Sequence, residues 1–340
     1  MNTPIIVINP TVDELFNLKT KFGIDGSDIG IINNVSTMEE FVEAITSGGL
    51  ISLSNNISLS GFSIPAGVTA VINLNGKTLS SSTDVSNMDK TNPIYDFVLE
   101  GNVTIKNGSL NVVGIENKGT LNLDNVSITK ESNYGAAIKN NAGATLVTDE
   151  NTTITVNAIG SVTDTSGAAC IRSFGNLTVN GSTFNSLSMR TYAIISNGTT
   201  IMNDASINGV HGAWACDAGN ATIKDGDYTS NRHYGLYTSN DVVGSTVDVY
   251  GGTFKGGPMG NNTSVLVGSD DNEAVDSYVN IYGGKFYGNI KNQKNVKDTY
   301  GVKIYGGLFE NKPADELIAE GYSCSEEQNS DGFYTVTKNN

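Results

Sequence analysis

VDVYGGTF, which runs from Val247 to Phe254, is the stretch that decides the fold, because the chain repeats it. VNIYGGKF ends at Phe286 and VKIYGGLF ends at Phe309. Fainter copies lie upstream and read LTVNGSTF, VTIKNGSL and INLNGKTL. Each copy has two alternating apolar residues, a turn of Gly, Asn or Asp, and another apolar residue five positions after the second one. Repetition at a period of about 20–30 residues indicates a solenoid.

The second apolar residue of each copy marks one turn of the predicted solenoid, which gives about ten turns spaced 18 to 32 residues apart. The markers are Leu74, Ile105, Leu123, Ile154, Val179, Met202, Ile223, Val249, Ile281 and Ile304. Their partners five residues later are Leu79, Leu110, Ile128, Ile159, Phe184, Ile207, Tyr228, Phe254, Phe286 and Phe309. Alternating apolar residues predict short strands, and Gly and Asn supply the positive-φ corners between them. Successive turns are expected to stack about 4.8 Å apart, so that the markers form inward-facing ladders.

The repeat resembles that of the right-handed parallel β-helix, the fold of the pectate-lyase-like superfamily, over about residues 50–311. The resemblance implies an all-β, right-handed parallel β-helix solenoid of about ten turns with small helical and hairpin caps at both ends. An antiparallel sandwich is the alternative: the irregular spacing of the turns favours it, whereas the match between columns argues against it. The fold implies no particular activity, since it carries lyases, hydrolases, adhesins and phage spikes.

Two segments precede the repeat. Residues 36–49 are predicted to form a cap helix, because Ser36 and Glu39 make a capping-box pattern and Gly48 stops the helix. A helix that packs beside the rod without capping it is the alternative. Residues 1–35 do not fit the repeat, and their amphipathic pattern is expected to form an attachment or oligomerisation segment. Packing on the side of the rod is the alternative for this segment.

Residues 312–340 are predicted to cap the other end of the solenoid. A short helix opens around Pro313 and ends at Gly321. A hairpin follows, with strands at Tyr322–Glu327 and Phe333–Lys338. This helix and hairpin are expected to close the last turn.

The charge of the chain limits its partners. It has 340 residues, with 20 basic and 35 acidic side chains and a net charge of −15. Nucleic acid and anionic membrane surfaces are therefore not expected partners, and an acidic polysaccharide would be repelled unless a local patch or a metal intervenes. Met1–Pro4 opens without the basic region of a signal peptide, and no stretch is long and apolar enough to cross a membrane. We expect production in a host cytoplasm without secretion.

The three cysteines are expected to be unpaired. Cys170 and Cys216 lie in strands separated by a whole turn, which places them about 10 Å apart, too far for a disulfide. They are predicted to be small core residues, and Cys324 an unpaired strand residue.

The sequence lacks the motifs of common enzymes and cofactor sites, among them phosphate-binding loops, HExxH, paired CxxC and GxSxG. Enzymes of the superfamily usually carry carboxylate pairs in adjacent turns. Here Asn329-Ser330-Asp331 departs from the NTD phrase of polygalacturonases, and Asp270-Asp271 has no histidine in register. Acidic loops are expected to be solvated rather than to hold calcium. We therefore predict a protein without enzymatic activity, cofactor or metal.

One cluster of rare residues is the candidate ligand site. The three Arg, two His and one Trp all lie between residues 172 and 233. Several fall at similar offsets from the markers of their turns, which predicts one edge of the rod with neighbours about 5 Å apart. The predicted ligand-binding residues are Arg190, His211, Trp214, Arg232, His233 and Tyr234. Arginine beside aromatic rings suits a glycan or a protein through stacking and cation–π contacts. A coincidence of rare residues on longer turns is the alternative.

Tyr250, Tyr282 and Tyr305 each follow an inward marker and are expected to point outward. A stacked ladder is the favoured interpretation. Sugar binding and a contact between protomers are the alternatives.

The YGGxF phrases, the AEGYSC and DGFYTV stretches near the end and GGLISLSNNISL near the start resemble repetitive β-helical proteins of gut bacteria and their phages. The resemblance implies a virion structural protein, a fibre or spike on a phage head or tail. It also implies a homotrimer that docks to other virion proteins through its N-terminal segment and faces a host surface glycan or protein. A bacterial surface adhesin and a polysaccharide depolymerase with a site between subunits are the alternatives.

Overall fold

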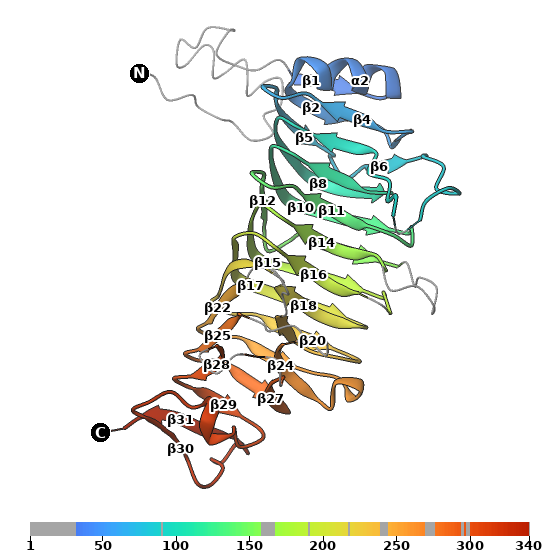
Figure 1. Ribbon diagram of the computed structural model, residues 1–340. Coiled ribbons are helices and arrows are strands. Elements are labelled where there is room, and N and C mark those ends of the chain that lie inside the picture. The colour runs from blue at the N-terminus through green and yellow to red at the C-terminus, as the bar shows by residue number, and fades with distance from the viewer. Residues whose placement is uncertain are drawn as a thin grey trace, which may run out of the picture.

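A computed structural model describes residues 32–89, 91–157, 167–189, 191–216, 218–238, 244–268, 276–293, 296 and 300–339. Within these residues the chain is a β-solenoid, with parallel strands stacked turn upon turn into an elongated rod (Figure 1). The predicted fold class, an all-β parallel solenoid, is confirmed, and the antiparallel sandwich is excluded. The right hand of the coil stays a prediction.

Two sheets form the rod, and in its described part the smaller one, here called sheet B, has ten strands. In spatial order, sheet B contains β4 (Phe62–Ile64), β7 (Phe97–Leu99), β9 (Ile115–Asn117), β11 (Ala136–Asn140), β14 (Ala169–Ser173), β16 (Tyr192–Ser196), β18 (Gly212–Cys216), β21 (Leu236–Thr238), β24 (Thr263–Val267) and β27 (Asn289–Asn292). These strands correspond to about ten stacked turns, as predicted.

The larger sheet, sheet A, holds two columns of strands. The first column contains β1 (Ile32–Val35), β2 (Gly49–Leu53), β5 (Thr69–Asn73), β8 (Asn102–Val112), β10 (Thr120–Lys130), β12 (Thr145–Thr148), β15 (Asn176–Ser186), β17 (Thr200–Gly209), β19 (Gly219–Ile223), β22 (Ser245–Val249), β25 (Tyr278–Ile281) and β28 (Gly301–Ile304). The second column contains β3 (Ile57–Leu59), β6 (Thr78–Ser81), β13 (Thr153–Val156), β20 (Asp227–Ser230), β23 (Thr253–Lys255), β26 (Lys285–Tyr287) and β29 (Gly307–Phe309). The long strands β8, β10, β15 and β17 run through both columns.

The register of sheet A confirms the predicted ladders over the C-terminal half of the rod. The paired columns are Ile223, Val249, Ile281 and Ile304 and, five residues later, Tyr228, Phe254, Phe286 and Phe309. All eight side chains are at most 1% exposed. The alternation of apolar residues therefore identified the inward face correctly.

One predicted marker belongs to the other column. Leu123 pairs with Thr148, whereas Ile154 pairs with Ile128. Thr148 was missed because it is polar, yet it is fully buried and accepts a 2.6 Å hydrogen bond from Oγ of Ser182. The corner of this turn is also one residue longer, which shifts the apolar spacing. Ile159, the predicted partner of this marker, lies outside the described residues.

A second marker is displaced by two residues. Ile72 rather than Leu74 pairs with Ile105, while Leu79 pairs with Leu110 as predicted. Leu74 is buried in the corner itself, where its carbonyl accepts from the amide of Lys77. Because Leu74 is apolar, the sequence pattern wrongly placed it in the strand.

The YGG corner explains why the repeat needs two adjacent glycines. The second glycine adopts a positive φ, of 94° at Gly252, 107° at Gly284 and 118° at Gly307. At the first glycine the constraint is space: a Cβ atom on Gly283 would lie 2.4 Å from the carbonyl O of Tyr250 in the preceding turn. Real Cβ atoms do not approach backbone so closely, so a side chain would force successive turns apart.

A column of stacked aromatic rings fills the interior of the C-terminal half. It consists of Trp214, Tyr228, Phe254, Phe286 and Phe309, with successive ring centroids 6.1, 4.7, 5.0 and 5.1 Å apart. From Tyr228 onward, neighbouring rings lie within 9° of parallel. From Tyr228 to Phe309 this packing follows from in-register stacking of one aromatic residue per turn, whereas Trp214 reaches the column from β18 of sheet B.

Buried amides fix the ends of the sheet B strands. Asn117 and Asn140 are fully buried at the ends of β9 and β11. Asn117 Nδ2 donates to Asn140 Oδ1 at 2.7 Å and to the carbonyl O of Thr145 at 2.9 Å. Asn140 Nδ2 donates to Ser173 Oγ at 3.0 Å and to the carbonyl O of Asn176 at 2.9 Å. These bonds link successive turns and so hold the sheet B register.

The N-terminal helix covers the first turn, as predicted for residues 36–49. It is α2 (Met38–Ser47), and Phe41 packs edge-on against Phe62 of β4 with centroids 5.3 Å apart. The capping box joins Thr37 to Glu40, one residue later than the pair predicted from Ser36. The Glu40 carboxylate accepts from the backbone amides of both Ser36 and Thr37, so the helix begins after Thr37.

The first predicted boundary moves toward the N-terminus. Residues 32–35 form β1, which pairs in parallel with β2. They therefore belong to the solenoid rather than to the segment predicted for residues 1–35. The rest of that segment, residues 1–31, lies outside the described residues.

The C-terminal cap has a hairpin but a smaller helical turn than predicted. The single 3-10 turn η2 (Asp315–Leu317) replaces the expected helix, because Ile318 leaves it to form a bridge with Ile304. The predicted hairpin is confirmed: β30 (Tyr322–Cys324) and β31 (Tyr334–Lys338) pair antiparallel. β31 also pairs antiparallel with β29, which ends the parallel stack of this column.

The three cysteines, all within the described ranges, form no disulfide, as predicted. Cys170 in β14 and Cys216 in β18 are buried and separated by β16, and Cys324 is half-buried in β30. Burial raises the pKa of the Cys170 thiol far above its usual value. Among the described residues, no helix has the length and apolar character needed to cross a membrane.

Candidate functional site

The outward face of sheet B carries side chains from successive turns at one position of each strand. In register, this column reads Glu116, Lys139, Arg172, Ile195, Ala215, Tyr237 and Leu266. Strand alternation points these residues away from the core, because the next residue in β9, β11, β14 and β16 is a fully buried polar side chain. The column therefore changes along the rod from charged to apolar and aromatic, and its apolar members Ile195, Ala215 and Leu266 are at most 9% exposed.

The aromatic part of this face is a cluster of three tyrosines and two histidines, here called the His–Tyr cluster. Its members are Tyr192, His211, His233, Tyr234 and Tyr237. Tyr237 stacks on Tyr192, with centroids 5.5 Å apart and ring planes 5° apart, and on Tyr234 at 5.6 Å. The two imidazoles lie 4.3 Å apart, and His211 meets Tyr192 edge-on at 5.3 Å. All five side chains are half-buried.

The backbone of three consecutive turns positions this cluster. Tyr192 begins β16 and is in register with Gly212, where a Cβ atom would lie 2.2 Å from the Tyr192 ring. Glycine at this position therefore lets the ring lie over the next turn. The amide of His233 donates to the carbonyl O of His211 at 2.9 Å, which stacks the two histidine-bearing loops. Nδ1 of His211 lies 3.2 Å from the carbonyl O of Met189.

Arg232 borders the cluster and influences its charge. Partial burial, and next the positive charge of Arg232, lower the pKa of His233. His233 is therefore more often neutral near pH 6.5 than an exposed histidine would be. Arg232 itself is half-buried, and its Nε contacts Sδ of Met259 at 3.1 Å. Met259 lies in the 3-10 turn η1 (Pro258–Gly260) and is 58% exposed.

The structure brings together His211, Arg232, His233 and Tyr234 of the predicted site, but the prediction for Trp214 was wrong. Trp214 is 0% exposed, because it takes the inward position of β18 in register with Ile194 and Leu236. Its Nε1 donates to Oγ of Ser196 at 2.8 Å. The indole is thus a core residue and offers no surface to a ligand. Arg190 lies outside the described residues.

Tyr192 and Tyr237 are the cluster members outside the predicted ligand-binding set, and sequence reasoning missed Tyr237 altogether. It lies two residues after a glycine, within a strand of sheet B, and the repeat was traced only through sheet A. A second repeated phrase was available: IENKG at 115–119, IKNNAG at 138–143, IRSFG at 171–175 and IISNG at 194–198. Aligning these phrases places their second residues in one outward column, which leads to Tyr237.

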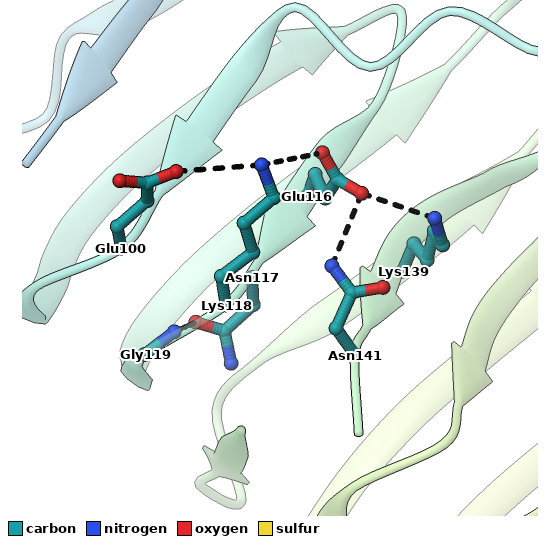
Figure 2. A network of polar contacts seen from close by, with 7 residues as sticks. All are labelled: Glu100, Glu116, Asn117, Lys118, Gly119, Lys139 and Asn141. Carbon is teal, nitrogen blue, oxygen red and sulfur yellow. Dashed lines mark hydrogen bonds and ion pairs between the residues drawn. The ribbon is translucent and has the colours of Figure 1, made fainter. Parts of the chain in front are cut away.

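The charged part of the same face is a network of ion pairs between turns, shown in Figure 2. One oxygen of Glu116 accepts from Lys139 and Asn141, each at 3.0 Å, and the other lies 3.4 Å from Nζ of Lys118. Lys118 also reaches Glu100 at 3.4 Å. Although burial acts in the opposite direction, the hydrogen bonds from Asn141 and Lys139 and the charges of both lysines lower the pKa of Glu116.

The connection between β6 and β7, residues 82–96, borders this network with an aromatic ring. The amide of Ala136 donates to Oη of Tyr95 at 3.1 Å, and Nζ of Lys139 lies 5.5 Å from the Tyr95 ring centroid. On the next strand, Arg172 is exposed, with its guanidinium carbon 5.7 Å from the centroid of Phe174. The cations Lys139 and Arg172, the rings of Tyr95 and Phe174 and the side-chain amide of Asn141 thus lie on one surface.

A buried lysine lies near this connection but not on the surface. Lys130, the last residue of β10, is 0% exposed, and its Nζ donates to the carbonyl O of Val113 and to Oγ of Ser132 at 2.5 Å. Burial lowers the pKa of Lys130 to about 7, while the charge of Asp96 acts in the opposite direction. Because Lys130 is buried, it cannot contact a ligand, but its substitution can test how the stability of the fold depends on pH.

The tyrosine column of sheet A points outward, as predicted. Tyr250 stacks on Tyr282, and Tyr282 on Tyr305, each pair with centroids 4.9 Å apart and planes within 15°. Tyr250 is 53% exposed and Tyr282 42%. Because the rings cover one another's faces, this column presents mainly ring edges to solvent. It is a stacked ladder, as predicted.

Comparisons with known proteins identify no relative. No family model, curated protein or solved structure matches the chain. In the part of the chain that the structure describes, no group of three or more His, Cys, Asp or Glu side chains could hold a metal ion.

Proposed function

We propose that the protein is a structural fibre or spike component of a phage virion, and that its rod contacts a host surface glycan through the His–Tyr cluster. The observation that carries the proposal is this cluster, in which five half-buried rings from three turns meet on the outward face of sheet B. The virion setting, the homotrimer and attachment to other virion proteins through the N-terminal segment rest on the sequence resemblance.

The chemistry of the cluster supports a sugar ligand. Tyrosine rings pack against the C–H faces of sugar rings, and their hydroxyl groups and the imidazole nitrogens exchange hydrogen bonds with sugar hydroxyls. Because β16 and β21 hold Tyr192 and Tyr237, and ring contacts hold the other members, little side-chain freedom is lost when a ligand binds. A rod with its site on one side can also present that site at a distance from the particle that carries it.

Binding of surface glycans to the purified full chain tests the proposal. Surface polysaccharide fragments from candidate host bacteria are titrated against wild type, Tyr237→Ala and Tyr250→Ala. We expect Tyr237→Ala to weaken binding about tenfold, since it removes the central ring of the cluster. Tyr250→Ala is the matched control, because it removes an exposed tyrosine from sheet A. Equal binding by wild type and Tyr237→Ala would overturn the role of the cluster.

The virion setting requires separate measurements. Light scattering of the full chain is expected to give the mass of a trimer, and antibodies against the rod are expected to label the surface of phage particles that carry the gene. Unlabelled particles would contradict the setting. Steady release of new reducing ends from the glycan during the titration would instead favour a depolymerase.

A further inference from the structure

We infer that Arg172 forms a subsite for the carboxylate of an acidic sugar unit in the glycan that the His–Tyr cluster binds. This inference rests on the proposed function and adds the chemical class of the ligand. It begins from the charges on the outward face of sheet B, where three cations and two carboxylates lie close together. They are Lys118, Lys139, Arg172, Glu100 and Glu116.

The ion pairs of this surface leave Arg172 without a carboxylate. Glu116 is shared by Lys118 and Lys139, and Glu100 pairs with Lys118. Throughout the described ranges, Arg172 forms no salt bridge and its guanidinium donates no hydrogen bond to another residue. The patch therefore has a local excess of one positive charge on a chain of net charge −15. Such a charge attracts an anion only at short range, because the rest of the rod repels it.

The surroundings of Arg172 suit a carboxylate attached to a sugar ring. Its guanidinium lies over Phe174, which is 37% exposed and offers an apolar surface to the ring. A planar guanidinium donates two parallel hydrogen bonds to a carboxylate, and a lysine cannot copy this arrangement. Lys139 lies one strand away in register but is held by Glu116 at 3.0 Å. One free cation matches one carboxylate better than it matches a doubly charged phosphate.

The position of Arg172 makes it part of the same binding face. From β14 to β21 the order of sheet B is β14, β16, β18, β21, so Arg172 and Tyr237 lie three strand spacings apart. That distance is about 14 Å along the rod. Ile195 and Ala215 occupy the two positions between them in the outward column and are 9% and 2% exposed, so other residues cover the sheet there. A glycan chain long enough to span this covered stretch would contact the tyrosines with one part and Arg172 with another.

Nuclear magnetic resonance on the full chain tests the subsite directly. The chain contains three arginines, Arg172, Arg190 and Arg232, so the Nε–H signal of Arg172 is assigned by its loss in Arg172→Ala. The probes are methyl glucuronide and its uncharged counterpart methyl glucoside. We expect the glucuronide to shift the Arg172 signal, and the glucoside at equal concentration to leave it unchanged. Equal shifts with both probes, or none with either, would overturn the inference.

Affinity for longer ligands gives the second readout. Uronic-acid-containing oligosaccharides are compared with their carboxyl-reduced forms. Wild type is expected to prefer the acidic form about tenfold, as one charge-assisted bidentate pair allows. Arg172→Ala should abolish the preference, and Arg172→Lys should keep only part of it. A preference that survives in Arg172→Ala, or equal competition by inorganic phosphate at matched ionic strength, would contradict a carboxylate subsite.

Tyr237→Ala separates this inference from the proposed function. It should weaken the acidic and reduced forms equally, because it removes a contact that does not depend on charge. If wild type binds the reduced form through Tyr237 but shows no preference for the acidic form, only the Arg172 subsite is wrong. If wild type binds neither form of any oligosaccharide, the proposed function is wrong as well.

Discussion

Replacing the buried Lys130 with methionine is expected to change how stability depends on pH. The folded pKa of Lys130 is about 7, compared with 10.5 for a solvated lysine. Folding therefore releases its proton between these values, and the unfolded chain binds more protons there. The free energy of unfolding must rise with pH across this range. The full shift corresponds to a destabilisation of about 5 kcal/mol below pH 7, of which about 2 kcal/mol is recovered between pH 6 and pH 8.5.

In Lys130→Met the amine is absent, so this part of the pH dependence should vanish. Urea unfolding followed by circular dichroism at pH 6, 7 and 8.5 measures the difference between the two proteins, after refolding has been shown to be reversible. Lys130→Met should be the more stable protein at pH 6, and its advantage should shrink by about 2 kcal/mol at pH 8.5. Above that pH the buried Cys170 acts in the opposite direction, because its raised pKa lets the unfolded chain ionise first.

The control for the loss of a lysine is Lys255→Met, which changes an exposed side chain of β23. Its stability should follow that of wild type at all three pH values. The carbonyl O of Val113 keeps a hydrogen bond from Ser132 at 3.2 Å, so Lys130→Met leaves it a partner. Parallel curves for wild type and Lys130→Met would show that Lys130 is charged in the fold and would refute the reasoning.

Three further substitutions, two of them with a control substitution, test the packing of the turns, each by its urea midpoint. Gly283→Ala should lower the free energy of unfolding by about 2–4 kcal/mol, because its Cβ would meet a backbone carbonyl at 2.4 Å. Gly143→Ala, with no atom within 4 Å but a φ of +81°, should lower it by about 1–2 kcal/mol. Equal losses in the two variants would contradict the steric account. Phe286→Ala should lower the free energy of unfolding by about 3–5 kcal/mol, because it leaves a cavity in the interior aromatic column. Tyr250→Ala, at an exposed position, should lower it by less than about 1 kcal/mol. The reverse order would be inconsistent with an inward column of phenylalanines. Asn140→Leu should cost about 2–4 kcal/mol, since it leaves buried groups in two neighbouring turns unpaired, and a neutral effect would show that the amide ladder is dispensable.

The fold could be predicted because stacking places equivalent residues of successive repeats directly above one another. One inward residue per turn, such as Val249, Ile281 and Ile304, produces one column. Errors arose where a corner changed length or where a buried side chain was polar. Thr148 is buried and accepts a hydrogen bond from Ser182, so its inward position leaves no apolar signal.

The candidate site was only partly predictable, because offsets within a turn do not fix the direction of a side chain. His211, His233 and Tyr234 meet, as their spacing suggested. Trp214 has a similar offset but points inward, because side chains alternate along β18. Distinguishing these directions requires the strand register of sheet B, which a repeat traced through sheet A does not provide.

The fit of each YGG corner against the carbonyl of the preceding turn makes neighbouring turns interchangeable. A Cβ atom on Gly251, Gly283 or Gly306 would lie 2.3, 2.4 or 2.5 Å, respectively, from a backbone oxygen of the turn before. A duplicated turn inserted between two such corners would find the same surface above and below it. Gene duplication can thus lengthen the rod in steps of about 4.8 Å without redesigning its core. The distance at which a binding face is presented can evolve separately from the face itself.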